Sequence, residues 1–300
     1  MQQDHAAALA FDLYSTEHYP FWCLNYFLML WFLSHITRVF FKRLAGSKLQ
    51  TSFAKLDPNK QDNVVIYVLQ LVGTTVALAA QIYGGADIIF QGKDTTSEVQ
   101  MTWLLVSIQV VAILYIWELI YRKEIGFPLL IHHLVTIVNS QVVAATFFDT
   151  HQIVYIRFAV LIGFHATMEQ PSFVALFLYR LGLCSKKWQA FWFNFSAVQT
   201  LVFKTMITTV TAVYYIFVVY NQEVVMDGSW GAFWILFFPP MTLCLYGAQA
   251  YSCYVLYLLG KKCKGEGSEC SLSKAEDTLT EIDELEVEEE PHQSSMSIEV

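Results

Sequence analysis

Residues 101–148 are MTWLLVSIQVVAILYIWELIYRKEIGFPLLIHHLVTIVNSQVVAATFF. Two apolar runs in this stretch, 101–121 and 127–148, each have the length of about 20 residues that an α-helix needs to cross the hydrocarbon core of a bilayer. Arg122 and Lys123 lie between them. Lipid offers no partner for backbone polar groups, so such a run crosses a bilayer as a helix that satisfies its own hydrogen bonds. The stretch therefore predicts two membrane-spanning helices joined by a short basic turn.

Five further apolar runs are present, at residues 21–41, 63–83, 153–180, 190–220 and 229–259. The first follows a polar segment, whereas a cleavable signal peptide begins with a basic one, so we expect a retained membrane anchor. The run at 153–180 is long and contains Pro171. Because proline removes a backbone donor from a helix, we expect this span to be kinked. The sequence thus predicts an all-α polytopic membrane protein with about seven transmembrane helices.

Basic residues lie in alternate loops of this arrangement. They follow the first, third, fifth and seventh runs, and they are Arg38, Lys42, Arg43, Lys48, Lys55, Lys60, Arg122, Lys123, Arg180, Lys186, Lys187, Lys261, Lys262 and Lys264. One basic residue, Lys93, lies in the intervening segments, which are 1–20, 84–100, 149–152 and 221–228. Cytosolic loops of membrane proteins carry an excess of Lys and Arg. We therefore expect a lumenal or outside N-terminus and a cytosolic C-terminus.

Charge separates the membrane core from an acidic tail. The chain of 300 residues is 55% hydrophobic and 15% charged, whereas a soluble domain has roughly 25% charged residues. Residues 265–300 contain 12 acidic residues and one basic residue, so the formal net charge of −8 belongs to the tail. This composition predicts disorder for the tail. We expect no nucleic-acid partner, because no basic patch with interleaved aromatic residues lies on a polar surface.

Two features near the C-terminus each allow two interpretations. The chain ends in Ser-Ile-Glu-Val, and the alternating Ile298 and Val300 could add as a strand to a PDZ-type partner. The alternative is an ending without a binding role. Cys253 and Cys263 flank the end of the last run, where reversible palmitoylation occurs in other proteins. The alternative is inert thiols in a reducing compartment.

Three predicted spans carry polar residues along one helical face. The faces contain His132, His133, Thr136, Asn139 and Ser140; then Arg157, His165, Glu169 and Ser172; and then Ser196, Thr200, Lys204, Thr208 and Thr211. Residues three or four apart share a face of a helix, and a charge inside a membrane costs at least about 2.5 kcal/mol. Such faces must therefore meet one another or a wet cavity. We expect a polar chamber open towards the cytosol; the alternative is purely structural pairing, such as Glu169 with Lys204.

The histidine pair and the nearby acid suggest two kinds of chemistry. A neutral imidazole of His132 or His133 can accept a proton while Glu169 orients it. Alternatively, three histidines and Glu169 could form one zinc site. Acid–base chemistry needs only two or three of these residues, so we expect no metal site and no bound cofactor.

A motif around the histidines resembles a known family. Arg122-Lys123-Glu124 precedes Ile131-His132-His133-Leu134-Val135-Thr136. A basic-acidic cluster followed by His-His-x-x-Thr resembles the TLC family, which includes ceramide synthases, translocation-associated membrane proteins and several lipid-homeostasis proteins. Farther along, Arg157, His165 and Glu169 are similar to the family's Arg … His-Asp-x-x-Asp series. The resemblance implies an endoplasmic-reticulum protein whose six later spans form a TLC-type bundle around a cytosol-facing chamber, with the first span packed outside.

The sequence also departs from the synthases. Ala166 stands where they have the first Asp, and Glu169 replaces the second. The segment between Thr136 and Arg157 is longer than theirs. The run Glu-Gln-Pro-Ser-Phe at 169–173 is more similar to the non-synthase members, which handle lipids. Together with the apolar runs and the charge pattern, the resemblance divides the chain into a lumenal or extracellular tail at 1–20, an anchor at 21–41, a TLC-like domain at 56–262 and an acidic, disordered cytosolic tail at 263–300.

Two functional hypotheses follow. In the first, the protein binds or senses a membrane lipid or acyl chain in lipid homeostasis, through His132, His133, Thr136, Arg157, His165, Glu169 and Lys204. In the second, it is an acyl-CoA-dependent N-acyltransferase resembling ceramide synthase, with acyl-CoA as co-substrate and with His132, His133 and Glu169 as catalytic residues. Other seven-span classes fit less well. A G-protein-coupled receptor would carry Asp-Arg-Tyr after the third span, and this chain does not. A retinal protein would carry its Schiff-base lysine in the last span, whereas Lys204 lies in the sixth.

Overall fold

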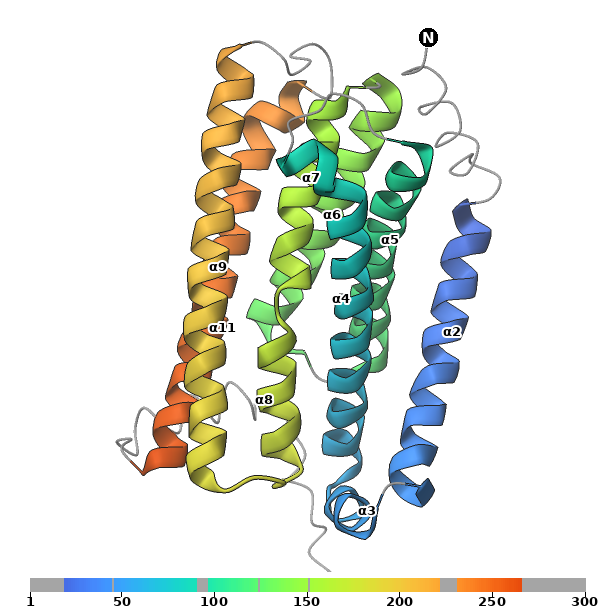
Figure 1. The fold of residues 1–300 in the computed structure, drawn as a ribbon, viewed down its shortest axis with the longest axis vertical. Helices are drawn as coiled ribbons and strands as arrows, with labels where there is room; N and C mark the ends of the chain where they lie inside the picture. The colour runs from blue at the N-terminus through green and yellow to red at the C-terminus, as the bar shows by residue number, and fades with distance from the viewer. Residues whose placement is uncertain are drawn as a thin grey trace, which may run out of the picture.

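The computed structural model describes residues 19–44, 46–90, 97–123, 125–150, 152–221 and 231–265. All regular structure within these ranges is helical (Figure 1). The predictions for the N-terminal tail up to residue 18, for Glu124 and for the acidic tail from residue 266, including Ile298 and Val300, lie outside the described residues.

Six long helices dominate the fold. They are α2 (Tyr19–Val39), α4 (Pro58–Phe90), α5 (Glu98–Tyr121), α6 (Phe127–Thr150), α9 (Lys186–Tyr220) and α11 (Phe238–Lys264). Three shorter helices are α3 (Ser47–Ala54), α7 (Ile153–Thr167) and α8 (Gln170–Arg180). Two π-helical turns, η1 (Phe40–Leu44) and η2 (Phe233–Phe237), extend α2 and lead into α11. Within the described ranges, six helices, with these turns included, are long and apolar enough to cross a membrane, which confirms an all-α, multi-pass membrane protein.

Local sequence signals explain where α5 begins and where α11 ends. At the start of α5, the Ser97 hydroxyl accepts a hydrogen bond from the Gln100 amide, and the Gln100 side chain accepts one from the Ser97 amide. This reciprocal pair satisfies two backbone donors that a helix start leaves free. α11 ends at Gly265, whose left-handed φ of 76° is one that glycine adopts readily.

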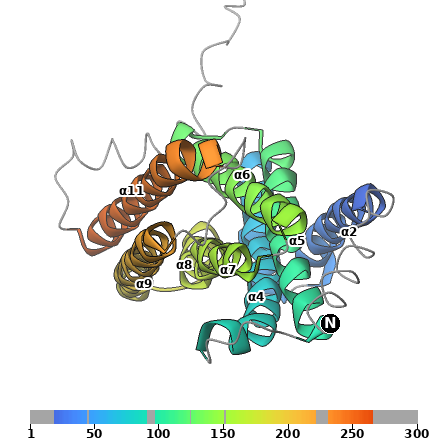
Figure 2. The same cartoon turned by 90° about the horizontal axis from the view of Figure 1, so that it is seen from above.

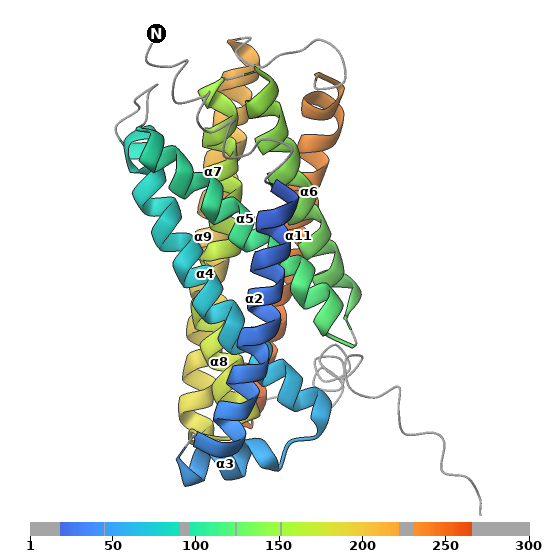
Figure 3. The same ribbon diagram turned by 90° about the vertical axis from the view of Figure 1, so that its right-hand side faces the viewer.

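α2 lies on the outside of the bundle, where it packs against α4 and α5 (Figure 3). Its outward face is apolar and exposed, with Leu24, Leu28 and Phe32 among the exposed side chains. Near its end, Arg38 forms an ion pair with Asp62 of α4 and donates to the Tyr121 hydroxyl of α5 at 2.9 Å. The polar contacts of Arg38 and apolar packing against α4 and α5 therefore hold α2 in place.

The remaining helices surround a common interior. α4 packs against α5 and α8, α9 packs against α8 and α11, and α6 packs against α7 and α11. Gly84 allows α4 and α5 to approach closely, because a Cβ at this position would lie 2.7 Å from the Leu104 side chain. At the end away from the basic loops, an apolar cluster around Phe158, Trp234 and Phe238 closes the bundle.

The predicted span 153–180 is broken rather than kinked. α7 ends at Thr167 and α8 begins at Gln170, and the two helices follow one another in the same direction (Figure 1). Pro171, in the first turn of α8, is well suited to a helix start, because the backbone N–H it lacks has no helical partner there. The Gln170 side chain donates to the Thr167 carbonyl at 2.5 Å. The prediction of seven membrane crossings depends on this pair of helices acting as one crossing, and it stays a prediction.

Candidate functional site

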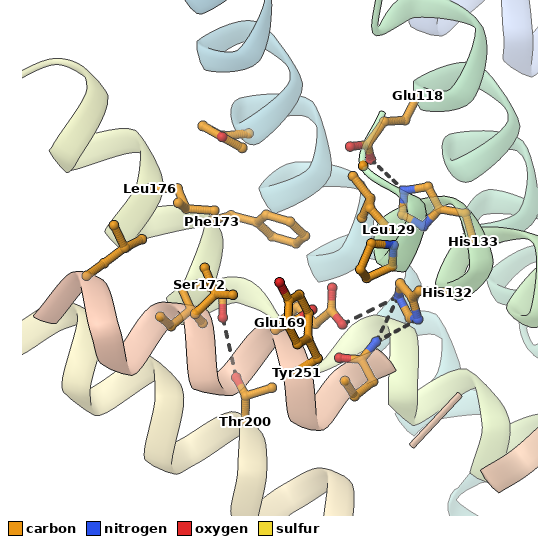
Figure 4. Close-up of a pocket in the computed structure, with 18 of the residues that line it drawn as sticks. Glu118, Leu129, His132, His133, Glu169, Ser172, Phe173, Leu176, Thr200 and Tyr251 are labelled. Carbon is orange, nitrogen blue, oxygen red and sulfur yellow. Dashed lines mark hydrogen bonds and ion pairs between the residues drawn. The ribbon is translucent and has the colours of Figure 1, made fainter. Parts of the chain in front are cut away.

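A cavity of about 190 Å³ lies among α4, α5, α6, α8, α9 and α11. Its lining includes His132, His133 and Glu169 from the predicted site. Figure 4 shows Glu118 and the two histidines on one side of it, with Phe173 and Leu176 on the other. Glu169 occupies the break between α7 and α8. Non-helical backbone inside a membrane is tolerated where it is buried in protein or lines a cavity, and this break does the latter.

His133 is held by a carboxylate on the neighbouring helix. Its Nε2 lies 3.1 Å from Glu118 Oε2, and the Glu118 Oε1 accepts a hydrogen bond from Arg122 Nη2 at 2.6 Å. Gln70 of α4 donates to the same carboxylate. The Tyr115 ring stacks on the His133 ring, with centroids 4.0 Å apart. The side chains of Glu118, His133, Arg122 and Gln70 are buried, and the carboxylate accepts hydrogen bonds from Arg122 and Gln70 that offset the cost of burying its charge.

His132 is held from the opposite direction. The Gln249 amide nitrogen of α11 lies 2.7 Å from its Nδ1 and 2.9 Å from its Nε2, so this N–H can donate to the unprotonated ring nitrogen. The Tyr115 hydroxyl lies 3.3 Å from His132 Nε2, and Glu169 Oε1 lies 3.7 Å from it. The ring is therefore positioned by groups from three other parts of the chain.

Glu169 is bound by a fully buried lysine. Lys204 Nζ of α9 donates to Glu169 Oε1 at 2.7 Å, and the lysine is 1% exposed. Removing a charge from water is costly, and the opposite charge at this distance offsets much of that cost. Glu169 keeps 14% of its side-chain surface exposed and lines the cavity. The lysine thus neutralises the carboxylate from behind and leaves part of it facing the cavity.

The cavity has an apolar part as well as a polar one. Phe173 and Leu176 of α8 and Val255, Leu256 and Leu259 of α11 contribute apolar walls. The charged groups and the two imidazoles come from α5, Arg122, α6 and the start of α8, and the Gln249 amide of α11 joins them at His132. Such zoning suits a molecule with one polar end and one apolar chain.

The other predicted site residues lie at differing distances from this cavity. Lys204 contacts it through Glu169, and His165 Nε2 lies 3.3 Å from the Thr208 hydroxyl on α9. Thr136 donates to the His132 carbonyl at 2.8 Å and lines a separate, much smaller cavity. Arg157 is half-buried on α7 and is not part of the lining. The break at Glu169 explains the difference, because Arg157 and His165 do not share a continuous helical face with it.

Sequence reasoning missed Glu118, Tyr115 and Gln249, and it used Arg122 as a basic loop residue and as part of the motif before His132, without a role in the site. A signal for Glu118 was present, since it is the one acidic residue in the run 101–121 and lies four residues before Arg122. That spacing places both on one helical face. No local signal marks Gln249, because its partner His132 lies 117 positions away.

Among the residues that the structure describes, no group of three or more His, Cys, Asp or Glu side chains could hold a metal ion. The neighbours of His132 and His133 are the carboxylates of Glu118 and Glu169, the Gln249 amide and the Tyr115 hydroxyl. Both ring nitrogens of His133 lie below the surface of the cavity, with almost no exposed area.

Comparisons with protein families, with curated proteins and with solved structures found no match to this chain. The TLC-type motif around His132 therefore remains a resemblance carried by the residues themselves.

Proposed function

We propose that this protein binds a membrane lipid or acyl chain in the cavity beside His132 and Glu169 and acts in membrane lipid homeostasis, as a protein of TLC type. The observation that carries the proposal is the zoning of the cavity. Apolar side chains of α8 and α11 form one part, and two carboxylates, a guanidinium, two imidazoles and an amide form the other. Small-molecule sites are typically apolar cavities with a few polar groups that fix orientation.

The position of the cavity favours a lipid over a water-soluble metabolite. Five of the helices around it, α4, α5, α6, α9 and α11, are long and apolar enough to cross a membrane, and the outer surfaces of α9 and α11 expose apolar side chains such as Val202, Ile216 and Leu243. We place the basic loops in the cytosol, which puts the cavity in the cytosolic half of a bilayer. The same resemblance to TLC proteins makes the endoplasmic reticulum the proposed membrane.

Binding is favoured over catalysis by the state of the two histidines. A general base must reach the proton that it removes. The ring nitrogens of His133 have almost no exposed area, and Gln249 and Tyr115 lie within hydrogen-bonding distance of His132. The partly exposed Glu169 is the acidic group best placed to meet a ligand.

One observation favours acyl transfer as the second candidate function. Glu118 orients His133 at 3.1 Å, as a carboxylate orients the imidazole of a catalytic dyad. In that reaction an amine nitrogen would attack the thioester carbonyl of acyl-CoA, the carbon–sulfur bond would break, and the amine proton would pass through the imidazole to the departing thiolate. The ring nitrogens of His133, which have almost no exposed area, would first have to become accessible to the amine.

The test is mass spectrometry of lipids retained by the purified protein, with acyl-labelled acyl-CoA and a long-chain amine added to a parallel sample. We expect a retained lipid in the wild type and at least a fivefold loss of it in His132→Ala/Glu169→Gln, without transfer of label. The matched control is His35→Ala, since His35 is an exposed histidine on α2 outside the cavity.

Two results would contradict the proposal. Equal lipid retention in the double variant and in the control would place the lipid elsewhere on the protein. Label transfer that depends on His133 and Glu118 would establish the acyltransferase instead.

A further inference from the structure

The cavity wall on α11 continues to the outer surface of the bundle. Six residues of this helix line the cavity, at positions 249, 251, 252, 255, 256 and 259. Gln249, Leu256 and Leu259 are buried, Val255 is half-buried, and Ser252 and Tyr251 are exposed, the last at 39%. At 100° per residue these positions follow one flank of the helix from its buried face to its exposed face. The cavity therefore reaches the surface along this flank.

The neighbouring helix on that flank is α6. Seen from above, α11 begins beside α6 and runs away from it towards its C-terminal end (Figure 2). Pro128 and Leu129, in the first turn of α6, line the same cavity and are half-buried. We call the gap between these two residues and Tyr251, Ser252 and Val255 the lateral opening. Figure 4 shows Leu129 and Tyr251 near the front of the cavity.

On α11, the lateral opening lies at the depth of lipid chains. Lys261, Lys262 and Lys264 end α11, and Lys261 Nζ lies 4.8 Å from the centroid of the Tyr257 ring. Tyrosine and lysine are typical of the level of the lipid headgroups. Tyr251 precedes Lys261 by ten residues, which is about 15 Å of helix. Half of a bilayer's hydrocarbon core is also about 15 Å thick.

Taken with the proposed function, on which this inference rests, we propose that the ligand is a bilayer lipid that enters sideways through the lateral opening. Its polar group lies among His132, Glu169 and Gln249, and its chain passes between α6 and α11 into the hydrocarbon of the surrounding leaflet. Tyr251 and Ser252 form the α11 side of the lateral opening through which the chain passes.

The experiment uses the full chain in dioleoylphosphatidylcholine vesicles that contain phosphatidylcholine with a diazirine near the end of one acyl chain. After irradiation, mass spectrometry locates the adducts. Surrounding lipid reaches the exposed face of α11, for example Leu243, but it does not reach Leu256, which is 7% exposed and lines the cavity. Adducts at Leu256 therefore report chains inside the cavity.

We expect Ser252→Trp to lower the cavity adducts at least tenfold and to leave the adducts on the outer face unchanged. Leu243→Trp is the matched control, because Leu243 lies on the same helix, is exposed and does not line the cavity. Tyr251→Ala widens the opening and should raise the cavity adducts. This opposite response protects the test against a Ser252→Trp variant that fails to fold.

Cavity adducts that persist in folded Ser252→Trp would overturn the lateral route and leave lipid binding intact. A wild type that retains lipid on purification but gives no cavity adducts from the vesicles would also overturn it. A wild type with neither retained lipid nor cavity adducts would overturn the proposed function together with this inference.

Discussion

α2 and α9 present similar surfaces to the outside and opposite surfaces to the inside. Both expose rows of large apolar side chains, such as Leu28 and Phe32 on α2 and Val202 and Val213 on α9. The inner face of α2 packs through apolar residues into a cluster with α4 and α5. The inner face of α9 buries Ser196, Thr200, Lys204 and Thr211. The outer surfaces of two spans thus say little about function, whereas a polar inner face marks the helix that helps to build the cavity.

The difference also predicts where the protein is sensitive to substitution. Buried charges are costly to leave unpaired, and the inner faces around the cavity contain two such groups. One is Glu169 with Lys204, and the other is Glu118 with Arg122 and His133. α2 depends on apolar area and on a partly exposed ion pair. Substitutions at Lys204, at Glu118 and at the ion pair of α2 should therefore lower the free energy of unfolding by different amounts.

The largest effect is expected from Lys204→Met, which leaves Glu169 buried without its cation. Breaking a buried ion pair on one side costs about 3–5 kcal/mol. We expect a loss of that order in the free energy of unfolding, measured by titration with sodium dodecyl sulfate and followed by tryptophan fluorescence. Retained lipid should fall in parallel, since Glu169 would shift or take up a proton.

The control for this effect is Lys204→Met/Glu169→Gln, which removes both charges. It should be more stable than Lys204→Met alone, because no unpaired carboxylate remains. If Lys204→Met is as stable as the wild type, the ion pair contributes nothing to stability. The inner face of α9 would then be no more sensitive to substitution than that of α2.

A smaller effect is expected from Glu118→Gln. The substitution removes the carboxylate that holds Arg122 at 2.6 Å and His133 at 3.1 Å. Leaving such partners unsatisfied costs about 1–3 kcal/mol, and the same detergent titration measures it. Asp57→Asn is the matched control, because Asp57 pairs with Lys60 at 3.0 Å on the surface and an asparagine can still cap α4. Equal losses in the two variants would argue against a special role for Glu118.

Much of the fold was predictable because membrane helices are specified by length and apolarity. The runs 101–121 and 127–148 correspond to α5 (Glu98–Tyr121) and α6 (Phe127–Thr150). The inward direction of the polar faces was predictable for the same reason, because lipid cannot satisfy polar groups. His132, His133 and Glu169 accordingly meet at one cavity.

The rest depended on tertiary contacts that no local pattern contains. Pro171 indicated a disturbance of its helix, but the sequence did not show that the helix would stop at Thr167 and expose Glu169 to the cavity. Glu118 lies so near the basic turn after α5 that its burial was not evident from the sequence. Its role depends on Gln70 and His133 from two other helices.

The smallest effect is expected at α2. Arg38 and Asp62 are 30% and 17% exposed, and ion pairs near the surface contribute about 0–1 kcal/mol. Arg38→Gln should therefore lower stability by less than about 1 kcal/mol and leave lipid retention at the wild-type level. Lys42→Gln, at an exposed basic residue of the same region, controls for the loss of one positive charge.

This prediction tests whether α2 is independent of the cavity, because Arg38 also donates to Tyr121 and Tyr121 lies three residues after Glu118 on α5. If Arg38→Gln loses lipid to the extent that Glu118→Gln does, while Lys42→Gln does not, α2 acts on the cavity through α5. The two regions would then form one unit despite their different inner faces. Unchanged lipid retention would instead establish α2 as an anchor that can be loosened without disturbing the cavity.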